Sequence, residues 1–464
     1  MKRLKDFFVN GHEYIFDGES VQLFPKETYC KAIKAEKPLN SHRTNYLKTI
    51  CLVLNNSCNL GCEYCFANKG HYDKPNEQMD FAIAKQAVDN LAKEVKENNG
   101  NEMSISFFGG EPLLSFNLIQ EIVHYISENY PCYSVHYMIT TNGTLINKEI
   151  AEFMETNKFD IMISIDGTQE IHDYYRKFLN GCGSYQRLLK GISYFKNPQI
   201  LNARITITNI NYDICSYIDS ILNLGFRRIT FAVDYNISEI AFHGYLLSLK
   251  KLIKKYFNDI ANGKLYDITN FSRVIVNIAL NQRNLSHCNA GISYLAVSAD
   301  GKYYRCPRFV GKENFLLGKV NDITHMHNEI QNFKRKLSLP EIRNPNCQKC
   351  VYVYLCGGMC YHHSYVVSRN EFNTTPRECD EKFTIFEGVI EGICKLSTKE
   401  RRTLLLFYTN LWNLIRKEEQ KWVILLRAKL LTLVWPQVNW KNFGLALRLQ
   451  SAKADLKEAL ANII

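Results

Sequence analysis

The chain has 464 residues, of which 46% are hydrophobic and 22% are charged, so it is too long for one ordinary core and too apolar for a disordered protein. Its net charge of +11 comes mainly from residues 395–464, where thirteen Lys or Arg outnumber five Asp or Glu, and the nearly balanced remainder argues against nucleic-acid binding. No N-terminal run has the parts of a signal peptide, so the sixteen cysteines indicate metal or redox chemistry in a reducing cytoplasm rather than disulfides.

Residues 1–47 are predicted to contain a β-hairpin. Two short apolar runs, 12–16 and 21–24, lie on either side of Asp17-Gly18, which is typical of a tight turn. A third apolar run, Phe7-Phe8-Val9, precedes them. The segment is too short for a core of its own, so we expect it to pack on the rest of the chain.

Residues 48–264 alternate between apolar runs of strand length and amphipathic stretches of helical length. The predicted strands are 50–54, 103–108, 135–140, 161–165, 203–208 and 229–233. The predicted helices include 81–95, 118–128, 148–155 and 245–260. Alternating strands and helices predict right-handed βαβ units on a parallel sheet, so the fold class is α/β.

The last two segments differ in their patterning. In residues 265–395 regular patterning fades and cysteine spacing organises the chain, so we expect metal clusters to replace part of a core. Residues 396–464 form a basic tail with helical patterning, in which the apolar stretch 422–435 is too short to span a bilayer. We expect the tail to pack or self-associate, and the alternative is contact with a membrane surface.

Ten cysteines fall into two ordered groups. The first is the C-x3-C-x2-C triplet Cys58, Cys62 and Cys65, and the second is a downstream septet, namely Cys288, Cys306, Cys347, Cys350, Cys356, Cys360 and Cys379. Three thiolates cannot complete a four-ligand iron–sulfur cluster, so one iron stays free for another ligand. Structural zinc is the alternative, but zinc sites use ligands in fours and fit a triplet and a septet badly.

The triplet resembles the signature of the radical S-adenosylmethionine (SAM) enzymes, and the septet resembles their SPASM extension, including Gly301 between the first two septet cysteines. Together the two matches cover about residues 50 to 390. The resemblance implies a partial, TIM-like (β/α)6 barrel with its chemistry at the C-terminal ends of the strands, followed by a Cys-rich iron–sulfur domain. It also implies that Cys58, Cys62 and Cys65 hold a catalytic [4Fe–4S] cluster.

Further motifs at the predicted strand ends resemble the family's SAM-binding stretches. Tyr64 stands where the family keeps an aromatic residue against adenine, although an ordinary half-buried tyrosine is the alternative. In Gly109-Gly110-Glu111-Pro112 the glycines allow close backbone approach, and Glu111 could accept from the methionine ammonium. The stretches with Asn142 and Ser164 would line the pocket. Ser164 and Arg176 are candidates for the ribose or the methionine carboxylate, unless Arg176 forms a surface ion pair.

The resemblance also divides the septet between two auxiliary iron–sulfur clusters, both expected to be [4Fe–4S]. Cys347, Cys350, Cys356 and Cys379 would ligate one cluster completely. Cys288, Cys306 and Cys360 would hold the other, whose fourth iron would take His287, a solvent ligand or a substrate thiolate.

The resemblance implies reductive cleavage of SAM to a 5′-deoxyadenosyl radical, with electrons from a flavodoxin or ferredoxin, and a precursor peptide as the substrate. The stretch from Cys306 to Gly318 resembles that of thioether-forming maturases of Cys-rich peptides. A carbon–carbon cross-link is the second possibility, and oxidation of a sulfatase residue to formylglycine is another. Sulfatase-maturing enzymes place an acidic residue directly after the equivalent of Cys306, where this chain has Pro307.

Overall fold

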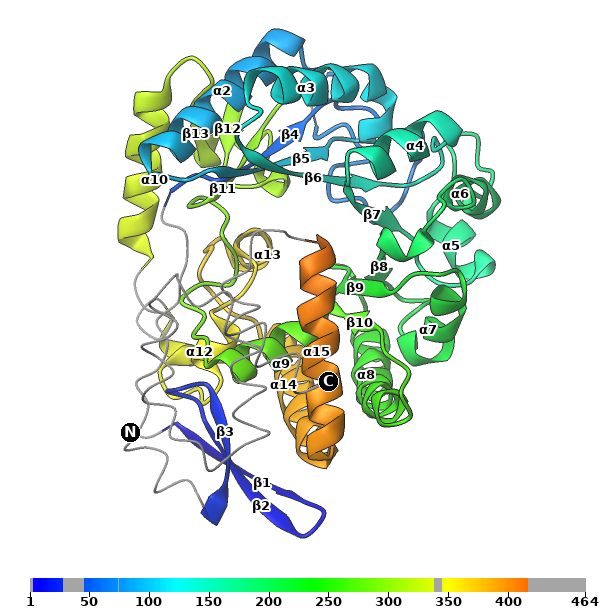
Figure 1. The fold of residues 1–464 in the computed structure, drawn as a ribbon, viewed down its shortest axis with the longest axis vertical. Helices are drawn as coiled ribbons and strands as arrows, with labels where there is room; N and C mark the ends of the chain where they lie inside the picture. Colours follow the sequence, from blue (N-terminus) through cyan, green and yellow to red (C-terminus); the bar gives the residue numbers. More distant parts are fainter. Residues whose placement is uncertain (1–2, 28–45, 74, 338–343, 416–464) are drawn as a thin grey trace, which may run out of the picture.

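Ten strands form one continuous curved sheet, in the order β10-β9-β8-β7-β6-β5-β4-β11-β12-β13 (Figure 1). The computed structural model describes residues 3–27, 46–73, 75–337 and 344–415. Strands β4 to β11 of this sheet pair in parallel, whereas β12 and β13 are antiparallel. Their bounds are β4 Thr49–Val53, β5 Glu102–Phe108, β6 Ser134–Thr141, β7 Asp160–Ser164, β8 Leu201–Ile207, β9 Arg228–Val233, β10 Asp267–Ile268, β11 Tyr294–Val297, β12 Lys302–Tyr304 and β13 Leu316–Lys319.

Helices cover the outer side of this curved sheet (Figure 1). They are α2 Phe81–Glu97, α3 Phe116–Asn129, α4 Lys148–Thr156, α5 Gln169–Tyr175, α6 Tyr185–Ile192 and α7 Ile214–Asn223. The long helix α8 Glu239–Ala261 follows, and then the shorter α9 Thr269–Leu280. The six predicted strands and four predicted helices are therefore confirmed to within a few residues at most ends, and so is the α/β fold class.

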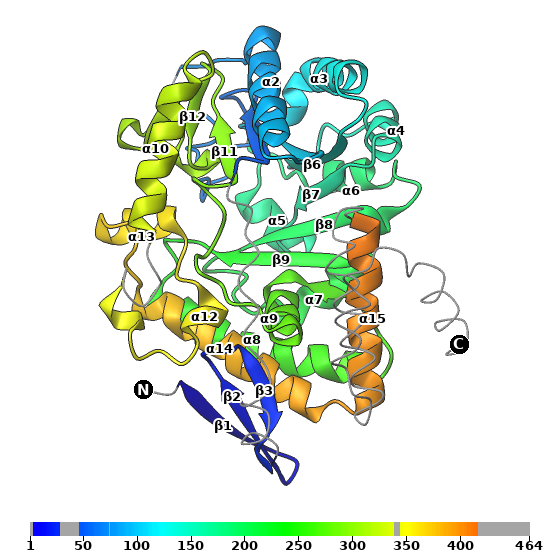
Figure 2. The ribbon, with the colours of Figure 1, turned by 60° about the vertical axis from the view of Figure 1, so that its left-hand side comes forward.

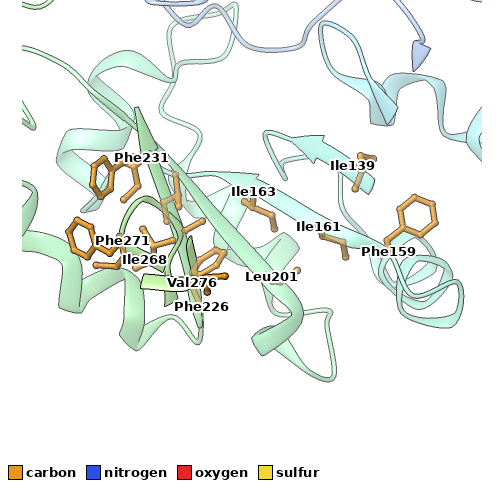
Figure 3. Close-up of a cluster of buried hydrophobic side chains, with 14 of the residues drawn as sticks. Ile139, Phe159, Ile161, Ile163, Leu201, Phe226, Phe231, Ile268, Phe271 and Val276 are labelled. Atoms are coloured by element: carbon orange, nitrogen blue, oxygen red, sulfur yellow. The ribbon is translucent and has the colours of Figure 1, made fainter. Parts of the chain in front are cut away.

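Alternation along the strands separates core side chains from site side chains. Ile161 and Ile163 of β7 are fully buried in the core, which Figure 3 shows together with Phe231, Ile268 and Phe271. The residues between and after these two isoleucines, Met162 and Ser164, line a cavity on the opposite face of the sheet. A period of two along each strand thus builds a core on one face and a site on the other.

The predicted N-terminal hairpin is confirmed and is joined by a third strand. The strands β1 Leu4–Val9, β2 His12–Asp17 and β3 Gln22–Pro25 form a separate antiparallel sheet. It lies at one end of the molecule beside α14 in both ribbon views (Figures 1 and 2). The Phe16 ring lies 5.6 Å from the Tyr352 ring, between centroids, so this segment packs on residues more than 300 positions away in sequence, as its short length led us to expect.

The expectation that regularity fades between 265 and 395 is only partly correct. This range contributes β10 to β13 to the large sheet and contains α9, α10 Ile323–Lys336, α12 Val353–Cys356, α13 Tyr361–Ser368 and α14 Pro376–Lys395. Helix α14 has an amphipathic pattern, with Ile385, Phe386, Val389 and Ile390 buried against the core that includes α8 and α9. Because β11 pairs with β4, the sheet includes strands from both sides of the predicted boundary near residue 264.

The start of the predicted helical tail is a helix, α15 Thr398–Ile415. Leu404, Leu405 and Tyr408 are buried, and the Tyr408 hydroxyl hydrogen-bonds that of Tyr256 in α8, so this part of the tail packs on the protein as expected. The apolar stretch 422–435 lies outside the described residues. Among the described helices, none combines the length and the apolar character needed to cross a membrane.

Candidate functional site

The predicted SAM-site residues line one cavity of about 500 Å³, hereafter the first cavity. It lies at the C-terminal ends of β4 to β9, where parallel strands of this kind place functional residues. Its lining includes every residue that the sequence assigned to this site, namely Cys58, Cys62, Tyr64, Cys65, Gly109, Gly110, Glu111, Asn142, Ser164 and Arg176. The structure therefore brings together residues that are more than 110 positions apart.

The cysteine triplet occupies the loop that follows β4. Burial raises the pKa of Cys58 to about 12 and that of Cys62 to about 11, and the proximity of the other thiols contributes. Thiols with such a raised pKa are protonated at neutral pH and become thiolates when a metal binds them. Within the described ranges, no three His, Cys, Asp or Glu side chains converge as the ligands of one zinc ion would. In a four-iron cluster each thiolate binds a different iron, so its three donors need not converge on one point.

The two glycines at the end of β5 serve close backbone packing. A Cβ atom on Gly110 would lie 2.0 Å from the carbonyl oxygen of Ser57, the residue directly before the triplet. The amide of Glu111 donates to the same carbonyl at 2.7 Å. Gly110 thus lets the end of β5 fix the position of the cysteine loop, in addition to lining the first cavity.

Glu111 is 1% exposed and ties the ends of β5 and β6 together. Its carboxylate accepts from the Leu113 amide at 3.0 Å, the Thr141 hydroxyl at 2.7 Å and the Asn142 amide at 2.8 Å. A carboxylate has about four acceptor sites, so one remains for a ligand in the cavity. Burial raises the pKa of Glu111 to about 7 despite these three hydrogen bonds.

Asn142 connects the end of β6 to the cysteine loop. Its amide nitrogen donates to Asn59 Oδ1 at 2.9 Å and lies 3.8 Å from Cys58 Sγ. Its amide oxygen accepts from the backbone and the hydroxyl of Thr144. The side chain is therefore held by protein contacts at both ends and sets the orientation of the first cysteine.

Arg176 forms an internal ion pair. Its Nε donates to Asp166 Oδ2 at 2.7 Å, and the two side chains are 8% and 1% exposed, so the surface ion pair considered from the sequence is wrong. The Tyr64 hydroxyl donates to the same carboxylate oxygen, and the Arg176 guanidinium lies 5.3 Å from the centroid of the Tyr64 ring. Asp166 also accepts from the Thr206 amide at 2.9 Å.

Asp166 is thus the centre of this part of the site, and the sequence analysis did not assign it a role. Its position two residues after the end of β7, in the same strand-end stretch as Ser164, is the sequence signal that could have identified it. Ser164 lines the first cavity and is half-buried.

Six of the seven downstream cysteines lie near one another in two groups. The pKa of Cys306 is raised to about 12 by burial and by the nearby Cys360 and Cys288. The pKa of Cys379 is raised to about 11 by burial and by Cys356 and Cys350. Cys347 precedes Cys350 in a hydrogen-bonded turn, in which the Cys350 amide donates to the Cys347 carbonyl at 3.1 Å. Cys356 and Cys360 thus lie near different cysteines although they are four residues apart.

A second cavity of about 500 Å³, hereafter the second cavity, adjoins the first. Cys360, His287 and His363 line it, while Cys306 lines the first. The two cavities share a wall that includes Arg204, Tyr235 and Arg308. The Arg308 guanidinium donates to the Tyr235 hydroxyl at 2.5 Å.

The shared wall carries the guanidinium groups of Arg204 and Arg308 together with the carboxylate of Asp234, a feature that the sequence analysis missed. Burial and the neighbouring Arg308 lower the pKa of Arg204 to about 10. Within the described residues, neither guanidinium has a carboxylate within ion-pair distance, and both face cavities that the cysteines line. Two such cations suit the negative charge of thiolate-bound iron.

Comparison with known proteins agrees with this geometry. A family model described as the Radical SAM superfamily matches residues 52–234. An uncharacterized protein of Methanocaldococcus jannaschii is 33% identical over 65% of this chain and 94% of its own. The radical SAM cyclopropyl synthase TigE of Paramaledivibacter caminithermalis is 28% identical over 68% of both chains. A cysteine-type anaerobic sulfatase-maturating enzyme of Clostridium novyi is 28% identical over 68% of this chain and 88% of its own.

Among solved structures, native anSMEcpe with bound AdoMet has a TM-score of 0.61 at 22% identity, covering 79% of this chain and 100% of that one. At this identity the likeness shows a shared fold. The match covers 79% of this chain, which is more than the residues outside 265–395 contain. It therefore extends beyond residues 52–234 into the cysteine-rich part of the chain.

Proposed function

Because this chain belongs to the radical SAM superfamily, we propose that it is a maturase that cross-links a ribosomally made precursor peptide, with a thioether to a Cys sulfur as its product. The family uses a [4Fe–4S] cluster and SAM, which when bound supply a 5′-deoxyadenosyl radical that removes a hydrogen atom from the substrate. The named relatives act as a cyclopropyl synthase and as sulfatase-maturating enzymes, which supports a substrate of peptide or protein class.

Within this proposal, Cys58, Cys62 and Cys65 hold the SAM cluster. Glu111 offers its remaining acceptor site to the SAM ammonium, and Tyr64 presents its ring to the adenine. Arg176 is held by Asp166, so its remaining N–H groups can donate to the carboxylate or the ribose beside Ser164. These side chains orient SAM and exclude water from the radical.

The auxiliary cysteines divide between two further iron–sulfur clusters. Cys347, Cys350, Cys356 and Cys379 complete one, while Cys288, Cys306 and Cys360 leave a position open in the other. We assign residues 265–395 to this auxiliary domain, 48–264 to the SAM core, 1–47 to an N-terminal segment and 396–464 to the tail.

The observation that carries the proposal is that Cys306 lines the same cavity as Cys58, Cys62 and Cys65. A substrate thiolate on the open auxiliary position would therefore lie beside the carbon from which hydrogen is removed. Arg308, two residues after Cys306, lines both cavities and would balance the negative charge of the thiolates.

A carbon–carbon cross-link is the second candidate, because the synthesis of a cyclopropyl group by the relative TigE forms a carbon–carbon bond. Sulfatase maturation is the third, because several relatives carry that name. Against it, Pro307 lies in the wall of the first cavity, where an acidic residue follows the equivalent of Cys306 in those enzymes, and a pyrrolidine ring cannot accept a proton.

The test is anaerobic turnover with the reconstituted protein, SAM, a reductant such as flavodoxin or ferredoxin, and the Cys-rich precursor peptide encoded beside the gene. Loss of two hydrogens per link, with thiols protected from alkylation, is the expected result. The same mass loss with free thiols would establish the carbon–carbon link. If only a sulfatase peptide were converted, sulfatase maturation would replace the proposed cross-linking reaction. If iron-replete protein formed no deoxyadenosine, the proposed enzyme activity would be refuted. We place this reaction in the cytoplasm.

A further inference from the structure

A third hollow leads from the second cavity to the surface of the protein. This outer groove has a volume of about 420 Å³ and is walled by Phe242 and Leu246 of α8, Val367 of α13, and Thr375 and Arg377 at the start of α14. All three hollows fall in the size range of ligand pockets, about 300 to 1,000 Å³. Their walls come from segments far apart in the sequence.

The three hollows adjoin one another, because neighbouring hollows share lining residues. Phe242, Val367, Thr375 and Arg377 line both the outer groove and the second cavity. Tyr235 and Arg308 line both the second cavity and the first. The outer groove therefore adjoins the cavity that Cys360 lines, and that cavity adjoins the one that Cys58 and Cys306 line.

We infer that the outer groove binds the precursor peptide segment next to the modified residue, in an extended conformation and with an apolar side chain against Phe242 and Val367. The inference rests on the proposed function and adds the part of the surface that selects the peptide. A peptide is the occupant because an extended chain that lies in the groove and in the second cavity would bring its next residue to the wall of the first cavity, beside the proposed reaction site.

The walls of the groove favour an apolar anchor. Val367 is 54% exposed, and Phe242 and Leu246 line the groove with it, so apolar side chains gather at this hollow. Exposed apolar residues gathered at a hollow are typical of a binding surface. Covering them with an apolar side chain would remove them from water.

The charged residues of the groove are Glu239, Arg377 and Asp380, and Arg377 is already paired with Glu239. Arg377 donates to Glu239 at 2.7 Å and to the Ile237 carbonyl at 2.9 Å, and its guanidinium lies 5.6 Å from the centroid of Phe242. Glu239 is 74% exposed in this pair, and an ion pair so open to water holds its geometry weakly. Arg377 can therefore turn to a carbonyl group of the bound peptide.

The test compares two neighbouring valines of α13. Val367 lines the outer groove, whereas the adjacent Val366 is 39% exposed and does not line it. Val367→Asp and Val366→Asp introduce the same charge near the same helix end, so any effect on the helix is matched. Anaerobic fluorescence anisotropy with the labelled precursor peptide measures Kd for each reconstituted variant, and iron content and deoxyadenosine formation without peptide verify that the protein is intact.

We expect Val367→Asp to raise Kd about tenfold or more, because it buries a charge beside an apolar side chain, and Val366→Asp to stay within about twofold. Unchanged binding by Val367→Asp, or equal weakening by both variants, overturns the inference, as does an absence of binding to the wild-type protein. Groove-dependent binding without modification of the peptide would instead refute the proposed reaction and leave the inference standing.

Discussion

Arg176 Nε lies 2.7 Å from Asp166 Oδ2, and both side chains are almost fully buried. The same carboxylate accepts from the Tyr64 hydroxyl, in the loop that carries the cysteine triplet. One carboxylate after β7 therefore holds two cavity-lining side chains, one from the triplet loop and one from the end of α5.

Replacing Asp166 with Asn should destabilise the protein by about 3 to 5 kcal/mol, because Arg176 would remain buried without its counter-charge. Chemical denaturation measures the change in the free energy of unfolding. Asp219→Asn is the matched control, since Asp219 pairs with Lys255 and Lys264 but is 50% exposed, and it should cost less than about 1 kcal/mol. Equal losses in both variants would contradict the role of Asp166.

Replacing Cys58 with Ala should remove about four irons per protein and abolish deoxyadenosine formation, because the remaining two cysteines cannot hold the SAM cluster. Iron analysis and chromatography of the reaction measure both effects. Cys182 is exposed and lies outside both cysteine groups, so Cys182→Ala should retain full iron and activity. A Cys58→Ala variant that still cleaves SAM would exclude the assignment.

Replacing Cys360 with Ala should perturb the same auxiliary cluster as replacing Cys306, because these thiols lie near each other and near Cys288. Replacing Cys356, four residues earlier, should perturb the cluster that Cys350 and Cys379 share. Electron paramagnetic resonance of the reduced variants distinguishes the two signals. If Cys360→Ala and Cys356→Ala lost the same signal, the crossed assignment would be wrong.

The affinity for SAM should fall as the pH decreases below about 7, which is the pKa to which burial raises Glu111. Protonation removes the negative charge that favours the SAM ammonium, so the affinity should drop up to about tenfold per pH unit below that value and level off above it. Calorimetric titration between pH 6 and 8 measures this dependence. Glu111→Gln should bind SAM weakly at every pH, and a variant that keeps the wild-type pH dependence would exclude Glu111 as its source.

Replacing Tyr408 with Ala should destabilise the protein by about 3 to 5 kcal/mol, because it removes a buried ring and the partner of the Tyr256 hydroxyl. Leu406, two residues earlier in α15, is 38% exposed, and its replacement by Ala should change stability by less than about 1 kcal/mol. Thermal unfolding of both variants decides whether α15 is part of the folded core. Similar melting temperatures for the two would show that the helix contributes little.

Local patterns predicted the barrel strands well. The apolar run around Ile161 and Ile163 predicts a strand in a covered parallel sheet, and β7 is found there. The resemblance to SPASM proteins implied that Cys356 and Cys360 belong to different groups, and the structure places them near different cysteines. Such information lies within short windows or fixed offsets of the sequence.

Contacts between distant segments could not be predicted in this way. Arg308 donates to Tyr235 across 73 positions, and no period or spacing in the sequence indicates that pair. Helix α14 is a different case, because the apolar positions Ile385, Phe386, Val389 and Ile390 do have helical spacing. This helix could therefore have been predicted from its periodicity, although the cysteine pattern that includes Cys379 runs into its first turn.

The side chain of Arg3 donates to the backbone carbonyls of Cys350 and Gln348, at 3.3 and 2.9 Å. Strands β1 to β3 therefore leave the ribosome long before the segment on which they dock. At about 5 to 20 residues per second, synthesis of the intervening residues takes roughly 20 to 70 seconds. During that time Phe16 lacks its packing partner Tyr352, so the nascent chain exposes apolar side chains of these strands to chaperones and to aggregation.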